Sequence, residues 1–371
     1  MRLLRKGIYK KRNSILLLLA TALAIACLHM NVSAQAGDFE VRKIANGVYV
    51  AMRTEPPGLT VIGNSVFIIN DKDVVVVDTT LTPGTASELL VALKKLTNKP
   101  VKYVINTHWH DDHIMGNEVF RKAFPDAQFI AHLATRDYLP GTGLANRKMA
   151  LSEQGYPGFI RSLRNRLARN ESVFGGPMNE EERSTYESSA KIAERYMAEN
   201  PGVEVVLPTI TLEDRLVLKR GRRTIEILFL GRGHTSGDVV VHLPKERVVV
   251  AGDLVVWPVP YIGSPQSHPG DWSVTLGKLI ALNPRAIVPG HGPVLNDHTY
   301  VKQMVRLLAS VKQQVEAAVL RGETLEQTRK RVNLDEFEKL FSGESRIRKL
   351  IFRNYVTGPA VGAAYLDAKA K

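Results

Sequence analysis

The sequence is poor in cysteine, because Cys27 is the only one among 371 residues. A single cysteine excludes an internal disulfide and also excludes a zinc module built from several cysteines. The main apolar run covers residues 15–28, and its 14 residues fall short of the roughly 20 that cross a bilayer. With 44% hydrophobic and 23% charged residues, the chain as a whole is not disordered, collagen-like or a coiled coil.

The first 34 residues have the composition of a targeting segment. They hold six Lys and Arg and no Asp or Glu, and removing them lowers the formal net charge from +13 to +7. The basic stretch 1–14 precedes the apolar run, and small residues follow it up to Ala34, an order typical of a secretory signal peptide. We therefore expect cleavage after Ala34 and a periplasmic or secreted protein. An uncleaved anchor and a lipidated Cys27 are the alternatives.

Export has consequences for the mature chain. It would lack cysteine and any stable membrane span, which suits an oxidising compartment. The remaining positive charge is typical of a solvated basic surface. Export also argues against nucleic acid as a partner and favours a small-molecule substrate. The oligomeric state stays open.

The remainder alternates between strand and helix patterns, which predicts an α/β fold. Amphipathic spacing over 304–315 predicts a helix that Gly322 ends, and a capping box at Thr85 and Glu88 predicts an earlier helix start. Two strand-rich blocks, 39–131 and 203–290, suggest two similar halves. Strands are predicted from β-branched or aromatic runs at 48–53, 65–69, 74–77, 101–105, 128–131, 203–206, 215–218, 224–229, 239–243, 248–251 and 286–288.

The segment 140–200 differs from both blocks. It is polar, helical in pattern and almost free of strand signals, and Asn179 with Glu182 forms a cap for a long helix. It is interpreted either as a helical elaboration with a small core of its own or as a lid over a site. The predicted organisation is a signal peptide at 1–34, a main domain at 35–298 containing this helical insertion, and a C-terminal helical extension at 299–371.

Histidine and aspartate carry the chemistry. His108, His110, Asp112 and His113 follow directly on the strand predicted at 101–105. Ligands of layered α/β folds bind at the carboxyl ends of strands. Two histidines spaced two apart in extended backbone point the same way toward one ion, and the next two ligands can reach a second ion. Three further candidates each follow a predicted strand beside a glycine: His234, Asp253 and His291.

These five histidines and two aspartates are enough for two zinc ions that share a carboxylate and a water. The set resembles that of the metallo-β-lactamase superfamily over about residues 39–295. Residues 75–79, which end in Asp78 and Thr79, resemble the first family motif, and the seven candidates match the others. The resemblance implies a four-layer αββα sandwich with a two-metal site on its edge.

The resemblance also implies a role for each ligand. His108, His110 and His234 would hold one ion, which is expected to be Zn²⁺ although other divalent metals are open. Asp112, His113 and His291 would hold the second, and Asp253 would bridge the two. Asp78 would support the site, or would simply end its strand in a turn.

The resemblance implies a hydrolase in which a metal-bridging hydroxide attacks the substrate and Asp112 orients that hydroxide. Many lactamases of the family use a cysteine at the second metal, and others lack a bridging carboxylate. Asp253 therefore favours cleavage of an ester, thioester or lactone of a small molecule. A β-lactamase and a non-catalytic exported metal-binding protein are the alternatives.

A loop rich in proline and aromatic residues follows Asp253. Trp257, Tyr261 and His268 in this loop are predicted to form a wall of the substrate site. Other histidines receive structural interpretations: His132 opens a helix and His298 starts the C-terminal helix.

Overall fold

The structure is a computed structural model that describes residues 33–36, 39–53, 58–59, 61–262 and 266–370. The signal-peptide prediction therefore falls almost entirely outside the described residues.

Thirteen strands within the described residues form two sheets. The first sheet runs in chain order through β1 (Ser33–Ala36), β2 (Phe39–Ala45), β3 (Val48–Arg53), β4 (Ser65–Ile69), β5 (Val74–Val77), β6 (Val101–Ile105), β7 (Gln128–His132) and β8 (Ile210–Leu212). The second sheet has the order β13 (Ala286–His291), β12 (Val248–Val256), β11 (Val240–Leu243), β10 (Arg223–Leu228) and β9 (Arg215–Arg220).

The two sheets repeat one plan, as the two strand-rich blocks suggested. In each, neighbouring strands are antiparallel at first and the last connections are parallel: β5 to β8 in the first sheet and β12 to β13 in the second. The parallel connections cross over through helices, which leaves several strand ends together on one edge.

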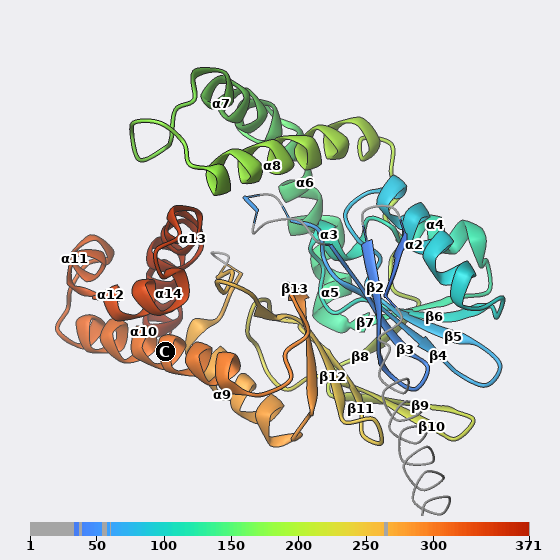
Figure 1. Ribbon diagram of the computed structural model, residues 1–371. Coiled ribbons are helices and arrows are strands. Elements are labelled where there is room, and N and C mark those ends of the chain that lie inside the picture. Colours follow the sequence, from blue (N-terminus) through green and yellow to red (C-terminus); the bar gives the residue numbers. More distant parts are fainter. Residues whose placement is uncertain (1–32, 37–38, 54–57, 60, 263–265, 371) are drawn as a thin grey trace, which may run out of the picture.

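Helices cover the outer face of each sheet, so the predicted four-layer αββα sandwich is confirmed (Figure 1). Strand β5 illustrates why both faces of a sheet are covered: all four of its valines are fully buried, so both of its faces need a packing partner. Val75 and Val77 pack between the sheets, while Val74 and Val76 pack outward against α2 (Pro83–Leu96) and α4 (Asn117–Ala123). The second sheet buries its outer face against α9 (Pro269–Ala281) and α10 (Thr299–Leu320).

Helix α2 begins three residues earlier than its predicted capping box. Its N-cap is Thr82, whose side chain accepts a hydrogen bond from the Thr85 amide, while the Thr85 hydroxyl accepts one from the Thr82 amide. Pro83 occupies the first helical turn, where its fixed φ suits a helix start. Glu88, taken from the sequence as a capping residue, instead pairs with Arg195 at 2.8 Å.

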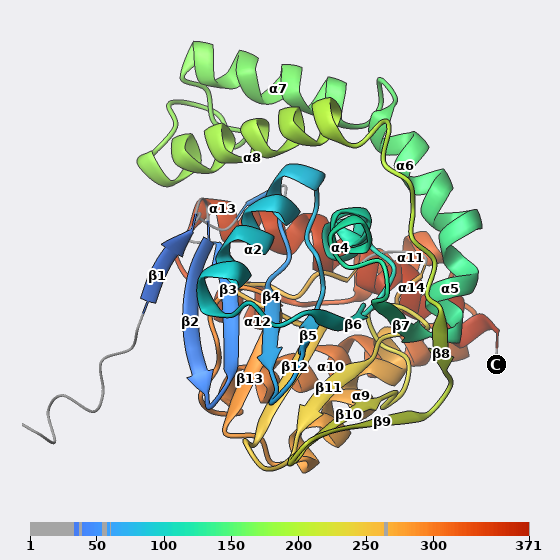
Figure 2. The same cartoon turned by 90° about the vertical axis from the view of Figure 1, so that its right-hand side faces the viewer.

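The segment between the two sheets is helical, as predicted. It comprises α5 (Leu133–Tyr138), the π-helical turn η2 (Leu139–Gly143), α6 (Leu144–Leu151), α7 (Tyr156–Arg169) and α8 (Glu180–Glu199). The cap at Asn179 and Glu182 is present, with both reciprocal hydrogen bonds. Figure 2 shows α7 and α8 above one end of the sandwich, with the β9–β10 hairpin at the other end.

The predicted strand at 203–206 was wrong. Val205 and Val206 pack against hydrophobic clusters without joining a sheet, and pairing with β7 starts only at Ile210. Pro208, which has no amide hydrogen to donate, lies between the two. The apolar alternation was therefore produced by burial rather than by strand pairing.

The chain ends in a helical layer against the second sheet. After α10 it forms α11 (Leu325–Arg331), α12 (Asp335–Ser342), α13 (Arg346–Phe352), the π-helical turn η3 (Arg353–Thr357) and α14 (Gly358–Lys369). Thr324 and Gln327 form the cap of α11. Among the described residues, no helix combines the length and apolar character that crossing a bilayer requires.

Candidate metal centre

All seven predicted ligands meet at one edge of the sandwich. His108 and His110 lie in the loop after β6, and Asp112 and His113 lie in the short helix α3 (Asp111–Ile114) that follows. The others are His234 after β10, Asp253 within β12 and His291 at the end of β13. They form two groups whose ligand atoms lie within 4.8 Å of one another: His108, His110, His234 and Asp253, and Asp112, His113, Asp253 and His291.

In the first group three imidazoles converge. His110 Nδ1 lies 3.1 Å from His108 Nε2 and 2.9 Å from His234 Nε2. Asp253 Oδ2 approaches the same point, 3.5 Å from His234 Nε2 and 4.0 Å from His108 Nε2. Three nitrogens and one oxygen directed at a common centre are a typical ligand set for zinc.

In the second group carboxylates and imidazoles alternate. Asp112 Oδ2 lies 3.0 Å from His291 Nε2 and 3.3 Å from His113 Nε2. Asp253 Oδ1 lies 3.2 Å from His113 Nε2 and 3.4 Å from His291 Nε2. The two oxygens of Asp253 therefore face different groups, which is the arrangement that a bridging carboxylate requires.

Side chains and carbonyls behind the ligands hold the rings in place. Asp78 Oδ2 lies 2.8 Å from His113 Nδ1, and the same carboxylate accepts bonds from the Thr107 amide and hydroxyl at 2.8 and 2.7 Å. His234 Nδ1 meets the carbonyl of Tyr261 at 2.8 Å. Such partners fix the orientation and tautomer of a metal-binding histidine. Asp78 thus supports the site, which is the first of its two interpretations.

Two glycines leave room for this crowding. A Cβ at Gly290 would overlap Asp253 Oδ1, and Gly252 has a φ of +52° with Thr107 packed where a side chain would project. Both positions therefore need glycine, one for space and one for conformation.

The electrostatics differ between the groups. Burial lowers the pKa of His110 to about 3, with His234 contributing, and burial also lowers the pKa values of His108 and His234. These rings are therefore neutral at neutral pH, with lone pairs available for a cation. In the second group, burial alone would lower the pKa of His291. The neighbouring Asp253 and Asp112 outweigh burial and raise that pKa to about 9. The two carboxylates of that group thus hold positive charge at this point, which a bound cation can supply in place of the ring protons.

The residues fit metal ions. Three buried polar atoms at the centre have no hydrogen-bond partner among the described residues: His113 Nε2, His291 Nε2 and Asp253 Oδ1. Buried polar atoms are almost always satisfied, so three orphans aimed at one point indicate a missing ligand. The donor set of imidazole and carboxylate suits zinc and similar divalent ions.

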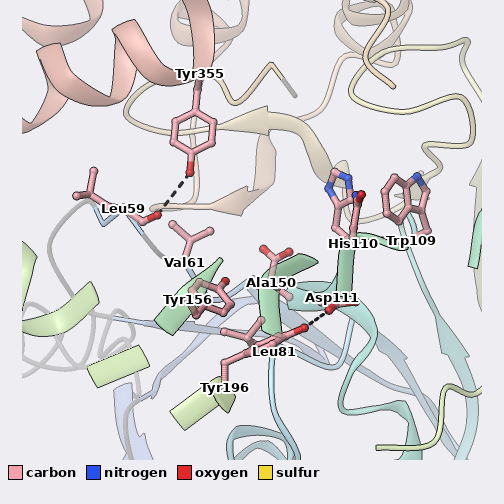
Figure 3. A pocket seen from close by; sticks show the side chains of 12 residues that line it. Leu59, Val61, Leu81, Trp109, His110, Asp111, Ala150, Tyr156, Tyr196 and Tyr355 are labelled. Carbon is pink, nitrogen blue, oxygen red and sulfur yellow. Dashed lines mark hydrogen bonds between the residues drawn. The ribbon is translucent and has the colours of Figure 1, made fainter. Parts of the chain in front are cut away.

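A pocket of about 400 Å³ opens beside Asp112 and His110 (Figure 3). Its walls come from the loop before β4, the helical insertion and the C-terminal layer. The lining residues are mainly aliphatic and aromatic: Leu59, Val61, Leu81, Trp109, His110, Asp111, Asp112, Asn146, Ala150, Tyr156, Tyr196 and Tyr355. None of these described residues is a Lys or Arg. Volume and lining are typical of a site for a small, largely apolar molecule.

Asp111 ties the insertion to the metal motif. Its carboxylate accepts bonds from Arg147 on α6, at 2.7 and 3.3 Å, and from the Tyr196 hydroxyl on α8, at 2.5 Å. Arg147 and Asp111 are largely buried, and such a pair holds its geometry because separating it leaves an uncompensated charge. The insertion is therefore fixed directly to the residue that precedes the ligand Asp112.

The predicted substrate residues lie elsewhere. His268 contacts Ser236 at 2.8 Å and Asp367 at 3.3 Å, and Trp257 lies under Arg348. Tyr261 is buried behind the site, where its ring stacks on Tyr355 with 4.5 Å between centroids. None of the three lines the 400 Å³ pocket, so their contact with substrate stays a prediction.

Three pocket tyrosines that sequence reasoning missed come from two distant segments. Tyr156 and Tyr196 belong to the insertion, and Tyr355 belongs to η3, where its hydroxyl donates to the Leu59 carbonyl at 3.4 Å. The segment 140–200 thus lines the pocket, while its role as a lid stays a prediction. No local motif marks Tyr355.

The chain matches the profile of the metallo-beta-lactamase superfamily over residues 59–291. It therefore belongs to that superfamily. A metallo-beta-lactamase from Pontibacter korlensis shares the fold, with a TM-score of 0.50 and 20% identity over 73% of this chain and 98% of that one.

Two curated relatives differ in the reactions their names describe. A linear primary-alkylsulfatase from Pseudomonas sp. (strain ATCC 19151) is 24% identical over 238 residues, which are 63% of this chain and 42% of the relative. An acyl-coenzyme A thioesterase, MBLAC2 of Bos taurus, is 32% identical over 98 residues, 24% of this chain and 33% of the relative. Each match thus spans less than half of the relative's length. Superfamily membership and these relatives support a hydrolase.

Proposed function

We propose that the protein is a two-metal hydrolase that cleaves an ester, thioester or lactone bond of a small molecule. One observation carries the proposal: two ligand groups that share Asp253 border a pocket with apolar and aromatic walls. His108, His110 and His234 would hold one ion, and Asp112, His113 and His291 the other. Bound zinc ions would supply an acidified water and polarise the scissile carbonyl.

The chain's own groups place the reactants. Asp112 lines the pocket as well as belonging to the second ligand group, so its carboxylate can accept a proton from the attacking water. Asp78, behind His113, keeps that ring oriented. Protein groups held in this way need no rearrangement when charge develops on the substrate.

Among the three lining tyrosines, Tyr156 is the one whose hydroxyl is free to donate a hydrogen bond to the substrate. The hydroxyls of Tyr196 and Tyr355 already donate, to Asp111 and to the Leu59 carbonyl. Tyr156 lines the same pocket and makes no hydrogen bond with its hydroxyl to any described residue. Burial raises its pKa, with Asp112 contributing, so the phenol stays protonated and available as a donor.

The walls indicate the class of substrate. Leu59, Val61 and Leu81 offer apolar surface, the tyrosines offer ring faces, and no described lining residue is cationic. An acyl chain or aromatic group without negative charge fits such walls, since burying a negative charge there would cost free energy without a cationic partner.

The test is a substrate panel on the purified, metal-containing protein. Uncharged acyl esters and thioesters of increasing chain length, lactones, a chromogenic β-lactam and an alkyl sulfate are compared by kcat/KM, with and without chelator. We expect chelator-sensitive turnover that is fastest with an ester, thioester or lactone. Preference for the lactam would make the protein a β-lactamase, and no turnover with full metal content would make it a binding protein.

An alkyl sulfate ester is a second candidate substrate. It is favoured by the relative named an alkylsulfatase, which aligns with 63% of this chain. The apolar pocket would accept an alkyl chain, but no described lining residue is a cation that could pair with the sulfate. The panel separates the two because they differ in the bond cleaved.

A further inference from the structure

A second and larger cleft, of about 900 Å³, lies at the end of the sandwich away from the metal centre. Its walls are the turns that precede strands: β2–β3, β4–β5, α2–β6, β9–β10, β11–β12 and α9–β13. The metal ligands lie instead at or near the carboxyl ends of strands, or in the loops that follow them. The five residues of β6 alone separate the two regions by about 17 Å, at roughly 3.3 Å per residue. Both views show this end below the sheets, around the β9–β10 hairpin (Figures 1 and 2).

The lining of the cleft is strongly basic. Its only described acidic residues are Asp71 and Glu246. Seven cationic side chains line it: Lys99, Arg220, Arg222, Arg223, Lys245, Arg247 and Arg285. The mature chain is only moderately basic, so this cleft gathers a large share of its excess positive charge.

Two of the arginines are structural. Arg223 pairs with Glu246 at 3.0 Å and donates to the carbonyls of Ile69 and Asn46, which joins turns of the two sheets. Arg220 pairs with Asp73 and lies over a tyrosine ring. These contacts neutralise both guanidinium groups and fix the cleft walls.

The other five cations have no ion-pair partner among the described residues. The Lys99 ammonium donates to the Asn70 carbonyl at 2.7 Å, and the Arg247 guanidinium donates to the Asn283 carbonyl at 2.9 and 3.1 Å. A carbonyl orients a cation without neutralising it. The three remaining side chains are on exposed residues of three different turns: Arg222, Lys245 and Arg285.

We propose that this cleft binds a ligand that carries several phosphate or sulfate groups. Five unneutralised cations around one concavity repel each other, and a multiply charged anion relieves that repulsion, whereas a single charge engages only one or two of them. Arginine forks match tetrahedral oxyanions with paired hydrogen bonds. The concave shape favours a discrete soluble ligand over a flat layer of lipid headgroups.

The test uses inositol hexasulfate as the probe, because it carries the required charge and binds metals weakly. Binding to the metal-containing protein is measured by calorimetry. The test variant combines Arg222→Glu, Lys245→Glu and Arg285→Glu. The control variant combines Lys191→Glu, Lys302→Glu and Arg329→Glu, which are equally exposed residues on distant helices and give the same change in charge. Metal content and ester hydrolysis are measured in parallel.

We expect saturable binding that weakens at least tenfold in the test variant and less than twofold in the control, with metal content unchanged in both. Equal losses in the two variants would reduce the effect to net charge and overturn the site. Absence of binding to the unaltered protein would also overturn it. In a second arm, vesicles containing phosphatidylglycerol replace the probe. If the cleft residues were required for binding to vesicles and the probe did not bind, the ligand would be a lipid headgroup. That result would overturn the proposal of a soluble ligand.

Discussion

Asp253 connects the two halves of the proposed metal centre at the scale of a single residue. Its Oδ2 faces the group of His108 and His234, and its Oδ1 faces His113 and His291. An imidazole that faces the site offers one nitrogen, whereas a carboxylate offers two oxygens. The two residue types should therefore differ in how many ions depend on them.

We predict that Asp253→Ala impairs both metals and that His291→Ala mainly impairs one. Mass-spectrometric metal analysis after mild purification should find well under one ion per chain in Asp253→Ala and about one in His291→Ala. Asp126→Ala, an exposed turn residue, is the matched control and should keep the full content. Two tightly held ions and near-normal turnover in Asp253→Ala would reduce Asp253 to a buried strand residue.

Tyr156 gives a second prediction at this scale. Tyr156→Phe keeps the ring and removes the hydroxyl, so it should lower kcat with esters by about a hundredfold, in line with loss of one donor to a developing oxyanion. Metal content and KM should change little. Tyr365→Phe, which removes a hydroxyl that donates to Glu323 in the C-terminal layer, is the control. Equal kcat values for Tyr156→Phe and the unaltered protein would leave Tyr156 as a packing residue.

At the scale of elements, the helical insertion supplies part of the pocket wall. Ala150 on α6 lines the pocket, while Ala168 on α7 belongs to the same insertion and is exposed. We predict that Ala150→Phe fills part of the 400 Å³ and lowers kcat/KM for long acyl esters about tenfold more than for acetyl esters. Metal content should not change.

Ala168→Phe is the control, because it adds the same bulk to the insertion outside the pocket. It should leave kcat/KM unchanged for both long acyl esters and acetyl esters. The same selectivity in Ala150→Phe and the unaltered protein would show that substrates bypass this pocket. The insertion would then be the scaffold of its first interpretation, tied to Asp111 for stability only.

The metal ligands could be predicted from the sequence because their signals are local. His108, His110, Asp112 and His113 stand within six residues directly after a predicted strand, and the remaining three each follow a predicted strand beside a glycine. Strand topology then brings these ends together. The α/β fold could be predicted for the same reason. Hydrophobic residues repeat every two positions in a strand and every 3.6 in a helix, and both patterns can be recognised within a short segment.

The pocket could not be predicted because its walls depend on packing between distant segments. Tyr355 reaches the pocket across 296 positions from Leu59, and Tyr196 is placed by its bond to Asp111, 85 positions away. The helix cap at Thr82 was misassigned for a different reason. Thr85 can occupy either the cap or the third helical position, and only the placement of Pro83 decides between them.

At the scale of the whole molecule, we predict export and cleavage after Ala34. Intact-mass analysis of the exported protein should give a chain that starts at Gln35. Ser33–Ala36 pairs with β2, so cleavage there would remove two of the four paired residues, Ser33 and Ala34, from that edge strand. A mature chain that begins at Met1, or one that carries lipid on Cys27, would contradict the signal-peptide interpretation.

The central claim is that hydrolysis depends on two ions held by the shared Asp253 site. Its most direct test is one titration: zinc is added back to the metal-depleted protein while bound zinc per chain and turnover of the best ester in the panel are followed together. The account predicts that turnover returns as the bound metal approaches two ions per chain. Saturation at one ion, or turnover by the metal-depleted protein equal to that of the zinc-loaded protein, would contradict it.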